Sequence, residues 1–292
     1  MPAYDAQWIK HEYLYTYRIA SKVQAVAEDP MAYIHDLEAL TLDFGIAEFI
    51  PNWQKDSALH KFIRYIADGI MDRDNTGSWK IRFGDPTSPK WTIPIEAALV
   101  TYGIQEKVEF ELTEIPQVYE QRGNITYASD APEVADACYN HFWELRWTQS
   151  YEELLNRMTE EVFFVMFTNR VTLQNLHEYL AEYVIENDYA YIVDEHPELA
   201  KYYTKSGRIE RRKPPKWARD AVFFRDHGKC TECRRDISGL LDPLSPKNFD
   251  HIVPLANGGL NDVSNLQLLC ESCNNSKSSR SVPSSNIYRR WY

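Results

Sequence analysis

Four cysteines in the last third of the chain stand in two closely spaced pairs. Cys230 and Cys233 form one Cys-x-x-Cys pair, and Cys270 and Cys273 form the other. Four soft thiolates at this spacing can close a tetrahedral Zn²⁺ site, which is structural because no coordination position stays open. Two disulfides or buried free thiols are the alternatives, but nothing in the sequence marks the chain as secreted. We therefore expect structural zinc, with the fifth cysteine, Cys138, as a small core residue of a helix.

Residues suited to hydrolysis of a phosphodiester lie between and just after these pairs. Such a reaction needs a base that deprotonates water and a cation that neutralises the charge building on the phosphate. His251 suits the base, because the ordinary pKa of histidine is about 6.5 and the neutral ring is available near pH 7. Asp250 and Asn274 offer hard oxygen ligands for Mg²⁺ or Mn²⁺. Taken singly, each residue has an ordinary structural explanation, such as a polar strand end or a capping side chain.

The segment that carries these residues predicts a strand, a loop, a second strand and a helix. Residues 248–252 (NFDHI) are typical of a short strand that Pro254 ends, and residues 257–259 (NGG) of a turn that permits positive φ. Residues 265–269 (NLQLL) predict the second strand, and the helix is expected to begin near Asn274. Side chains of consecutive strand residues point to opposite faces. Asp250 and His251 can therefore divide metal binding and water activation only if the phosphate lies at the end of the strand.

Three stretches of this segment, DHIVPLANGG, NLQLLC and CNNSK, resemble the HNH (ββα-metal) endonucleases in their zinc-stapled form. The resemblance covers about residues 217–280, and it places the signature positions of the family on His251, Asn265 and Asn274. The third is Asn rather than His, a variant that the family commonly uses. The resemblance implies that His251 is the base, that Asp250 and Asn274 hold the catalytic divalent ion, and that Asn265 holds the loop and orients His251.

The resemblance also implies a substrate and a product. HNH endonucleases cleave DNA to 5′-phosphate and 3′-hydroxyl ends, and one site faces one strand, so a monomer is expected to nick. HNH domains joined to helical regions also resemble the nucleases of bacterial restriction and antiphage systems, Zorya-type systems among them, and those of mobile elements; we favour a role in defence. Two alternatives stay open: a zinc-dependent DNA-binding or adaptor module without catalysis, and an RNA nuclease.

The charge of the chain is divided by region. The net charge is −11, which by itself disfavours a nucleic-acid partner. Residues 205–292, however, hold 16 Lys or Arg against 9 Asp or Glu, a net +7, whereas residues 1–204 carry −18. The residues expected to contact phosphate are Lys277, Arg211, Arg212, Lys213, Arg219 and Arg225. A solvated tether, or pairing with the acidic region, is the alternative use of the basic residues near 211–213.

The remainder of the chain predicts a mainly helical region with a small sheet. Apolar residues recur at helical spacing in residues 9–27, 31–42, 59–70, 154–166 and 173–184, and they alternate as in strands in residues 79–83 and 108–112. The expected fold is therefore α+β. It comprises an acidic regulatory or docking domain in residues 1–200, a basic linker in residues 201–216 and a ββα-metal zinc domain in residues 217–292. No family resemblance is evident in residues 1–200.

The sequence also bears on location and partners. No stretch approaches 18 consecutive apolar residues, and the first residues, MPAYDAQWIKHE, lack the pattern of a secretory signal. We therefore expect a cytoplasmic protein with DNA as its partner and no membrane association. The acidic N-terminal domain is a candidate for binding other proteins of a defence system.

Overall fold

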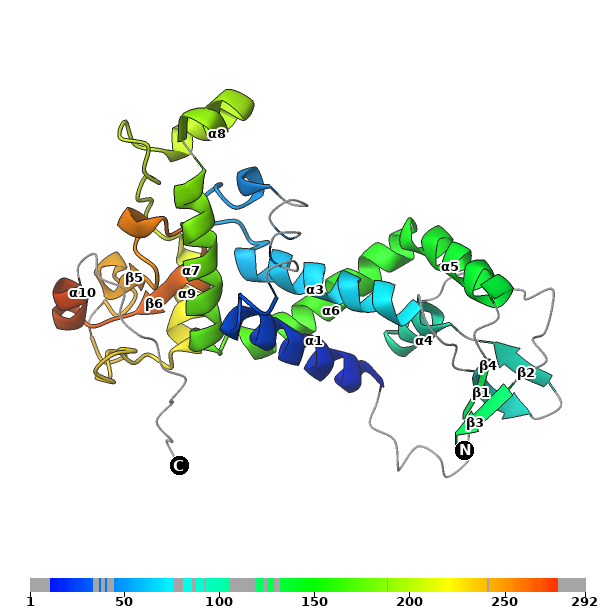
Figure 1. Ribbon diagram of the computed structural model, residues 1–292. Coiled ribbons are helices and arrows are strands. Elements are labelled where there is room, and N and C mark those ends of the chain that lie inside the picture. The colour runs from blue at the N-terminus through cyan, green and yellow to red at the C-terminus, as the bar shows by residue number, and fades with distance from the viewer. Residues whose placement is uncertain are drawn as a thin grey trace. The chain divides into compact units, whose positions relative to one another are not determined.

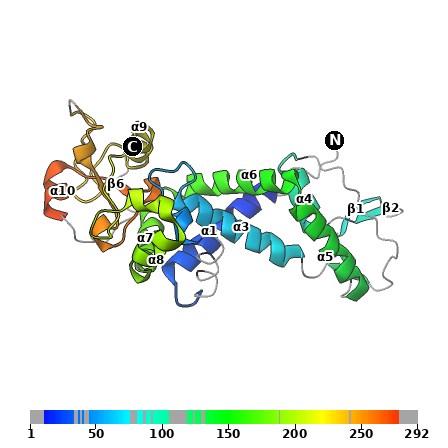
Figure 2. The same ribbon diagram turned by 90° about the horizontal axis from the view of Figure 1, so that it is seen from above.

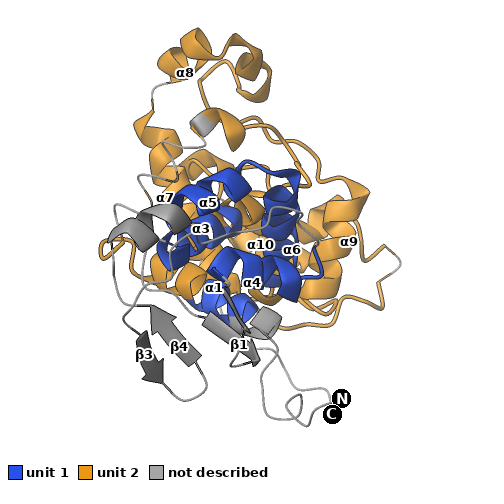
Figure 3. Ribbon diagram, turned by 90° about the vertical axis from the view of Figure 1, so that its right-hand side faces the viewer, with its two compact units in different colours: residues 1–21, 63–162 blue, residues 22–62, 163–292 orange. Residues whose placement is uncertain are grey.

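The computed structural model describes residues 11–33, 37, 40, 45–75, 81–85, 88–91, 93–104, 119–122, 125–128, 132–187, 189–240 and 242–277. The chain forms two compact units, residues 1–21 with 63–162 and residues 22–62 with 163–292 (Figure 3). These units divide the chain differently from the boundaries expected at residues 200 and 216. Residues 22–62 join the unit that contains the four paired cysteines, which a division by charge along the sequence does not anticipate.

Helices make up most of the described residues outside the C-terminal third. Helices α1 (His11–Glu28), α3 (Ala58–Asn75) and α6 (Gln149–Met166) contribute residues to both units, whereas α4 (Pro94–Thr101) and α5 (Pro132–Arg146) belong to the first unit. A four-stranded antiparallel sheet in the first unit has the order β2-β1-β4-β3, with β1 Ile81–Asp85, β2 Ser88–Trp91, β3 Tyr119–Arg122 and β4 Ile125–Ala128.

Most of the elements expected from apolar spacing are present. The helices expected at 9–27 and 59–70 and the strand near 79–83 are confirmed within the described residues as α1, α3 and β1. Of the expected helix at 31–42 only a few residues are described, and the expected strand at 108–112 lies outside the described residues. Cys138 lies in α5, but its side chain also lies outside what the structure describes.

The apolar stripe of α7 (Arg170–Glu186) explains its place in the second unit. Leu173, Leu176, Leu180 and Val184 recur at three- and four-residue steps, and all four are buried. The helix begins at a local cap, because Oδ1 of Asn169 accepts a hydrogen bond of 3.2 Å from the Thr172 backbone N–H. The helix contacts the 3-10 turn Val263–Asn265 of the C-terminal segment. Figure 1 and Figure 2 show α7 beside the orange part of the chain, to which this turn belongs.

The C-terminal segment forms the expected strand, strand and helix. Strands β5 (Phe249–His251) and β6 (Leu266–Leu268) pair antiparallel, with Asp250 opposite Gln267 and His251 opposite Leu266. Helix α10 (Glu271–Lys277) follows β6 directly, so the expectation that it begins near Asn274 is wrong by about one turn. The carbonyl of Cys270 accepts the Asn274 N–H at 2.9 Å, and this bond draws the second Cys-x-x-Cys into the first helical turn.

Two further elements support the sheet. Helix α9 (Lys216–Arg225) packs against β6. The carboxylate of Asp226 at its end accepts hydrogen bonds from Arg225 (2.8 and 2.9 Å) and from the Leu268 backbone N–H (3.0 Å). These buried charge-assisted bonds join the end of α9 to β6.

The segment expected to be a basic linker is folded along its first half. After helix α8 (Tyr189–Glu195), a 3-10 turn spans Pro197–Tyr202, and Tyr203 then pairs with Ile209 across a tight turn. The side chains of Tyr203 and Ile209 are buried. Gly207 in this turn has φ +72°, and a Cβ there would approach Tyr189 to 3.1 Å. Residues 201–209 therefore behave as an ordered part of the second unit.

Among the described residues, no helix has the length and apolar character needed to cross a membrane.

Candidate active site and metal centre

The four paired cysteines come together at one point of the second unit. Their Sγ atoms all lie within 4.8 Å of one another, and those of Cys233 and Cys270 are 3.6 Å apart. In a tetrahedral site with Zn–S bonds of about 2.3 Å, neighbouring sulfurs lie about 3.8 Å apart. None of the four forms a disulfide, which would need a sulfur–sulfur distance of about 2.05 Å. The cluster thus has the ligand type, number and spacing that fit structural zinc.

Backbone hydrogen bonds set the two cysteine pairs beside each other. In the first pair, the Arg234 N–H donates to the Cys230 carbonyl at 2.9 Å, and Arg234 has φ +62°, which closes a tight turn. The Thr231 N–H then donates to the carbonyl of Leu268 at 2.9 Å, at the end of β6. Because Cys270 follows β6 by two residues, this bond places the first pair next to the second.

Burial and mutual hydrogen bonding raise the pKa of two of these thiols and lower that of a third. Burial raises the pKa of Cys230, and burial together with hydrogen bonds to the other three cysteines raises that of Cys273. Burial also acts to raise the pKa of Cys270, but hydrogen bonds with Ser272 and Cys273 lower it to about 6. Among these three thiols, Cys270 therefore ionises most readily. A bound Zn²⁺ ion would compensate all four charges.

Asp250 lies on β5 with its carboxylate between two cations. Oδ2 is 2.8 Å from Nζ of Lys277 and Oδ1 is 3.4 Å from Nη2 of Arg211, and only 7% of the Asp250 side chain is exposed. Buried carboxylates need positive charge close by, since removal from water is costly for an isolated ion. The charge of this buried carboxylate is therefore balanced by two side-chain cations, and a divalent ion on Asp250 would add to or replace them.

His251 follows on the same strand and is almost fully buried. Its Nε2 lies 3.1 Å from Oδ1 of Asn261, and its ring centroid lies 6.0 Å from that of Trp53. Burial, followed by the charge of Arg211, lowers the pKa of His251 to about 4, although Asp250 acts in the opposite direction. The imidazole is therefore neutral at pH 7, as a general base must be.

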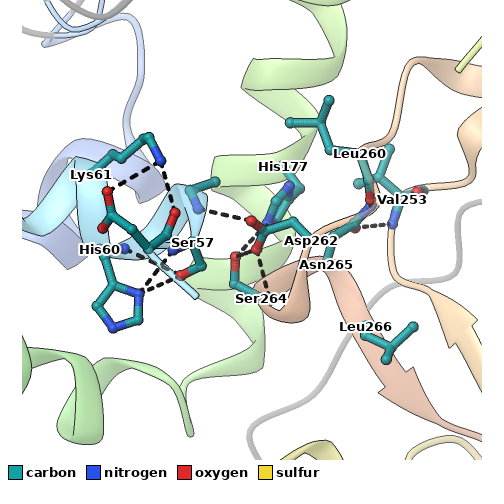
Figure 4. A network of polar contacts seen from close by, with 12 residues as sticks. Ser57, His60, Lys61, His177, Val253, Leu260, Asp262, Ser264, Asn265 and Leu266 are labelled. Carbon is teal, nitrogen blue, oxygen red and sulfur yellow. Dashed lines mark hydrogen bonds and ion pairs between the residues drawn. The ribbon is translucent and has the colours of Figure 1, made fainter. Parts of the chain in front are cut away.

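Asn265 closes the loop between β5 and β6 (Figure 4). Its Nδ2 donates to the carbonyls of Val253 (3.1 Å) and Leu260 (2.9 Å), and its Oδ1 accepts from the Val253 N–H at 2.9 Å. The side chain is fully buried. These bonds join both ends of the loop, so Asn265 acts on the backbone that follows His251 rather than on the imidazole.

Asn274 lies on α10 and is half-buried. Its Nδ2 donates to the Lys247 carbonyl at 2.7 Å, which leaves Oδ1 as the atom suited to a cation. Lys277, one helical turn further, reaches Asp250 and also the carbonyl of His251 at 2.7 Å. Helix α10 is therefore bound to β5 through Lys277, and to the 3-10 turn Pro246–Asn248 before β5 through Asn274.

The residues expected to contact phosphate fall into two groups. Lys277 and Arg225 are buried in ion pairs with Asp250 and Asp226, and Arg219 donates to the Leu244 carbonyl at 2.6 Å. These three are structural here because each cation satisfies a carboxylate or carbonyl inside the fold. Three residues remain exposed in the basic stretch, namely Arg211, Arg212 and Lys213.

Three residues of this site carry no signal that the sequence analysis used. Asn261 holds His251, and the pair Asn52–Trp53 holds Asn261 through hydrogen bonds of 2.6 and 2.8 Å. Asn261 stands two residues after the Gly-Gly turn, so its position in the loop could have drawn attention. Asn52 and Trp53 lie about 200 residues away in the chain, and no spacing pattern connects them with His251.

A comparison with protein-family models agrees with this geometry. Residues 230–280 match the family described as HNH endonuclease. The matched range contains both cysteine pairs, both strands and helix α10. The chain therefore carries an HNH nuclease domain with a cysteine cluster suited to zinc. Searches of curated proteins and of solved structures found no match.

Proposed function

We propose that this protein is a metal-dependent endonuclease that hydrolyses phosphodiester bonds of DNA. The observation that carries the proposal is the neutral, buried His251 directly beside Asp250 in a zinc-type HNH domain. The exposed basic residues Arg211, Arg212 and Lys213 precede this domain and supply positive charge for the DNA backbone.

The residues divide the reaction as follows. His251 takes a proton from the attacking water through Nδ1, while its Nε2 stays bonded to Asn261. Asp250 and Asn274 would hold Mg²⁺ or Mn²⁺ through their side-chain oxygens, and such an ion would neutralise the charge that builds on the phosphate. Asn265 keeps the loop after His251 closed. A chain with one such site would nick one strand.

One observation favours a second candidate, a zinc-stabilised DNA-binding module without catalysis. The ring of His251 is 1% exposed, and Asp250 is already paired with Lys277 and Arg211. A binding module needs no accessible base. An RNA nuclease is a third candidate, because the HNH motif does not discriminate between the two nucleic acids.

A plasmid assay separates these candidates. Supercoiled plasmid, linear duplex, single-stranded DNA and RNA are incubated with the protein in Mg²⁺ or Mn²⁺, with EDTA as control. We expect supercoiled DNA to become open circle only with the divalent ion, and His251→Ala to lower the rate by about 10²- to 10⁴-fold, the usual contribution of a general base. Binding without cleavage would support the module, and a His251→Ala protein as fast as wild type would remove His251 from the role of base.

We also propose a role in bacterial defence against phage or in restriction. Its support is the joining of an HNH domain to an acidic, mainly helical region, which would bind other defence proteins. The test is plaque formation on cells that express wild type or His251→Ala protein. Protection that is equal for the two proteins would separate any defence role from cleavage.

A further inference from the structure

We propose that Asn261 is a positioning residue that selects the tautomer of His251, and that Asn52, from the N-terminal part of the chain, holds Asn261 in place. This inference rests on the proposed nuclease function, because it concerns the base of that reaction. It makes the N-terminal segment a component of the nuclease site, in addition to any regulatory or docking role.

The first step is the orientation of the Asn261 amide. Its Nδ2 donates to the backbone carbonyl of Glu210 at 2.8 Å, and the backbone N–H of Arg212 points at its Oδ1 at 3.5 Å. A backbone carbonyl can only accept and a backbone N–H can only donate. These two groups therefore determine which end of the amide is nitrogen, and the oxygen is the end that faces His251.

The second step is the tautomer. Oδ1 of Asn261 can only accept, so Nε2 of His251, 3.1 Å away, must carry the proton. In a neutral imidazole the other nitrogen, Nδ1, then carries the lone pair. Nδ1 is buried and has no hydrogen-bond partner among the residues that the structure describes. The base is thus presented in one defined form, with its accepting nitrogen outside any hydrogen bond of the described residues.

The third step is the support that Asn261 receives from Asn52 and Trp53. Oδ1 of Asn52 accepts from Nδ2 of Asn261 at 2.6 Å, and the Trp53 backbone N–H donates to the Asn261 carbonyl at 2.8 Å. Trp53 has φ +55°, a strained conformation for a non-glycine residue that persists only where surrounding contacts impose it. These two hydrogen bonds hold Asn52 and Trp53 against Asn261, the residue that bonds Nε2 of His251.

A purely structural role for Asn261, closing the loop, makes a different prediction. Loss of a loop contact would lower stability and leave the tautomer of His251 unchanged. Loss of a positioning contact would release Nε2, so that both neutral tautomers become populated and only part of the protein holds the reactive form. The tautomer itself is therefore the property to measure.

The direct test is nitrogen NMR of full-length protein with ¹⁵N-labelled histidine, which distinguishes Nε2–H from Nδ1–H. His251→Gln identifies the His251 signals. We expect Nε2–H alone in wild type and a mixture of tautomers in Asn261→Ala. An Nδ1–H form in wild type, or an unchanged Nε2–H form in Asn261→Ala, would overturn the inference. The NMR result does not depend on nuclease activity. If the nuclease proposal fails, the plasmid assay shows this independently of the tautomer of His251.

The kinetic test uses Asn52. We expect Asn52→Ala to lower kcat for nicking by about 10-fold with little change in KM, since substrate contacts are kept while the base is less well placed. Asn52→Asp retains an acceptor for Nδ2 of Asn261 and should recover most of the rate. The matched control is Gln54→Ala, which removes hydrogen bonds to the Glu48 and Pro51 carbonyls in the same loop without touching Asn261. Equal losses in Asn52→Ala and Gln54→Ala, or no recovery in Asn52→Asp, would indicate a loop-folding effect and refute the positioning role.

Discussion

Nζ of Lys277 lies 2.8 Å from Oδ2 of Asp250, and both side chains are buried. The same ammonium group donates to the carbonyl of His251 at 2.7 Å. A single cation on α10 therefore binds two consecutive residues of β5, the proposed metal ligand and the proposed base. This pair connects the stability of the HNH domain to the charge at its proposed active site.

Removal of this cation should destabilise the protein in a metal-dependent way. Lys277→Met leaves the buried carboxylate of Asp250 without its closest counter-charge, and we expect the free energy of unfolding to fall by about 3–5 kcal/mol in buffer that contains no Mg²⁺ or Mn²⁺ and no chelator. Added Mn²⁺ should recover more stability in the variant than in wild type, because an ion on Asp250 replaces the lost charge. Urea unfolding followed by tryptophan fluorescence measures both effects.

The control for this change is Lys216→Met. Lys216 forms an exposed ion pair with Asp220 at 2.7 Å, and such pairs contribute about 0–1 kcal/mol. Similar losses in Lys277→Met and Lys216→Met would contradict the structural importance of the buried pair.

The cysteine cluster should hold one zinc ion for each chain. Elemental analysis of protein purified without chelator measures this directly. Cys273→Ser should abolish zinc retention and lower the melting temperature of the HNH domain, because the binding energy of a structural zinc ion is part of the folding energy. Cys138→Ser, outside both Cys-x-x-Cys pairs, should leave the zinc content at one. Retention of zinc by the Cys273→Ser protein would show that the four thiols are not its ligands.

The stability of the second unit should decrease in acid because of His177. Burial lowers the pKa of His177 to about 4, and Asp262 only partly opposes this effect. Between pH 4 and about 6.5 the unfolded chain therefore binds more protons at this residue than the folded chain does. Its share of stability is complete above pH 6.5 and is lost as the pH falls toward 4, an amount on the order of 3 kcal/mol.

His177→Gln tests this dependence. The fall in unfolding free energy from pH 7 to pH 4.5 should be smaller in the variant than in wild type, by roughly 2–3 kcal/mol. Protonation of His251 and of the cysteines affects both proteins and cancels in the comparison. His196→Gln, at a half-exposed position, serves as control. An acid dependence that is the same in wild type and His177→Gln would contradict a neutral, buried His177.

Gly258 should not tolerate a side chain. It has φ +83°, and a Cβ there would lie 2.5 Å from the carbonyl oxygen of Ala181 on α7. We expect Gly258→Ala to lower the free energy of unfolding by at least about 2 kcal/mol, through strain and displacement of the loop from α7. Gly239→Ala is the control, because a Cβ there meets no atom within 4 Å. A Gly258→Ala protein as stable as Gly239→Ala would mean that the loop does not pack on α7 in this way.

A polar network explains why residues far apart in sequence join one unit (Figure 4). Asp262 accepts from the Ala58 N–H at 2.9 Å, where α3 begins, and from the Ser264 hydroxyl at 2.5 Å. The Ser264 hydroxyl in turn lies 2.7 Å from Nε2 of His177 on α7. One carboxylate thereby links the N-terminal segment, α7 and the loop between β5 and β6.

Local patterns in the sequence were sufficient for the elements of the HNH domain. Each of these patterns lies within a short stretch of the chain. The two cysteines of a pair are three residues apart, Asp250 and His251 are adjacent, and the apolar stripe of α7 covers about three helical turns. Backbone periodicity converts such spacing into a shared face or a shared edge. For this reason the zinc cluster, strands β5 and β6, and α7 could be expected before any coordinates.

Only the tertiary structure decided which charges are buried and what holds the base. Nothing in the sequence around Lys277 and Arg225 distinguishes them from exposed basic residues. Lys277 is buried because it pairs with Asp250, and Arg225 because it pairs with Asp226. Asn52 reaches Asn261 because the chain folds back over about 200 residues. A contact between distant segments leaves no periodic trace in the sequence, since it is set by packing of whole elements rather than by the backbone between them.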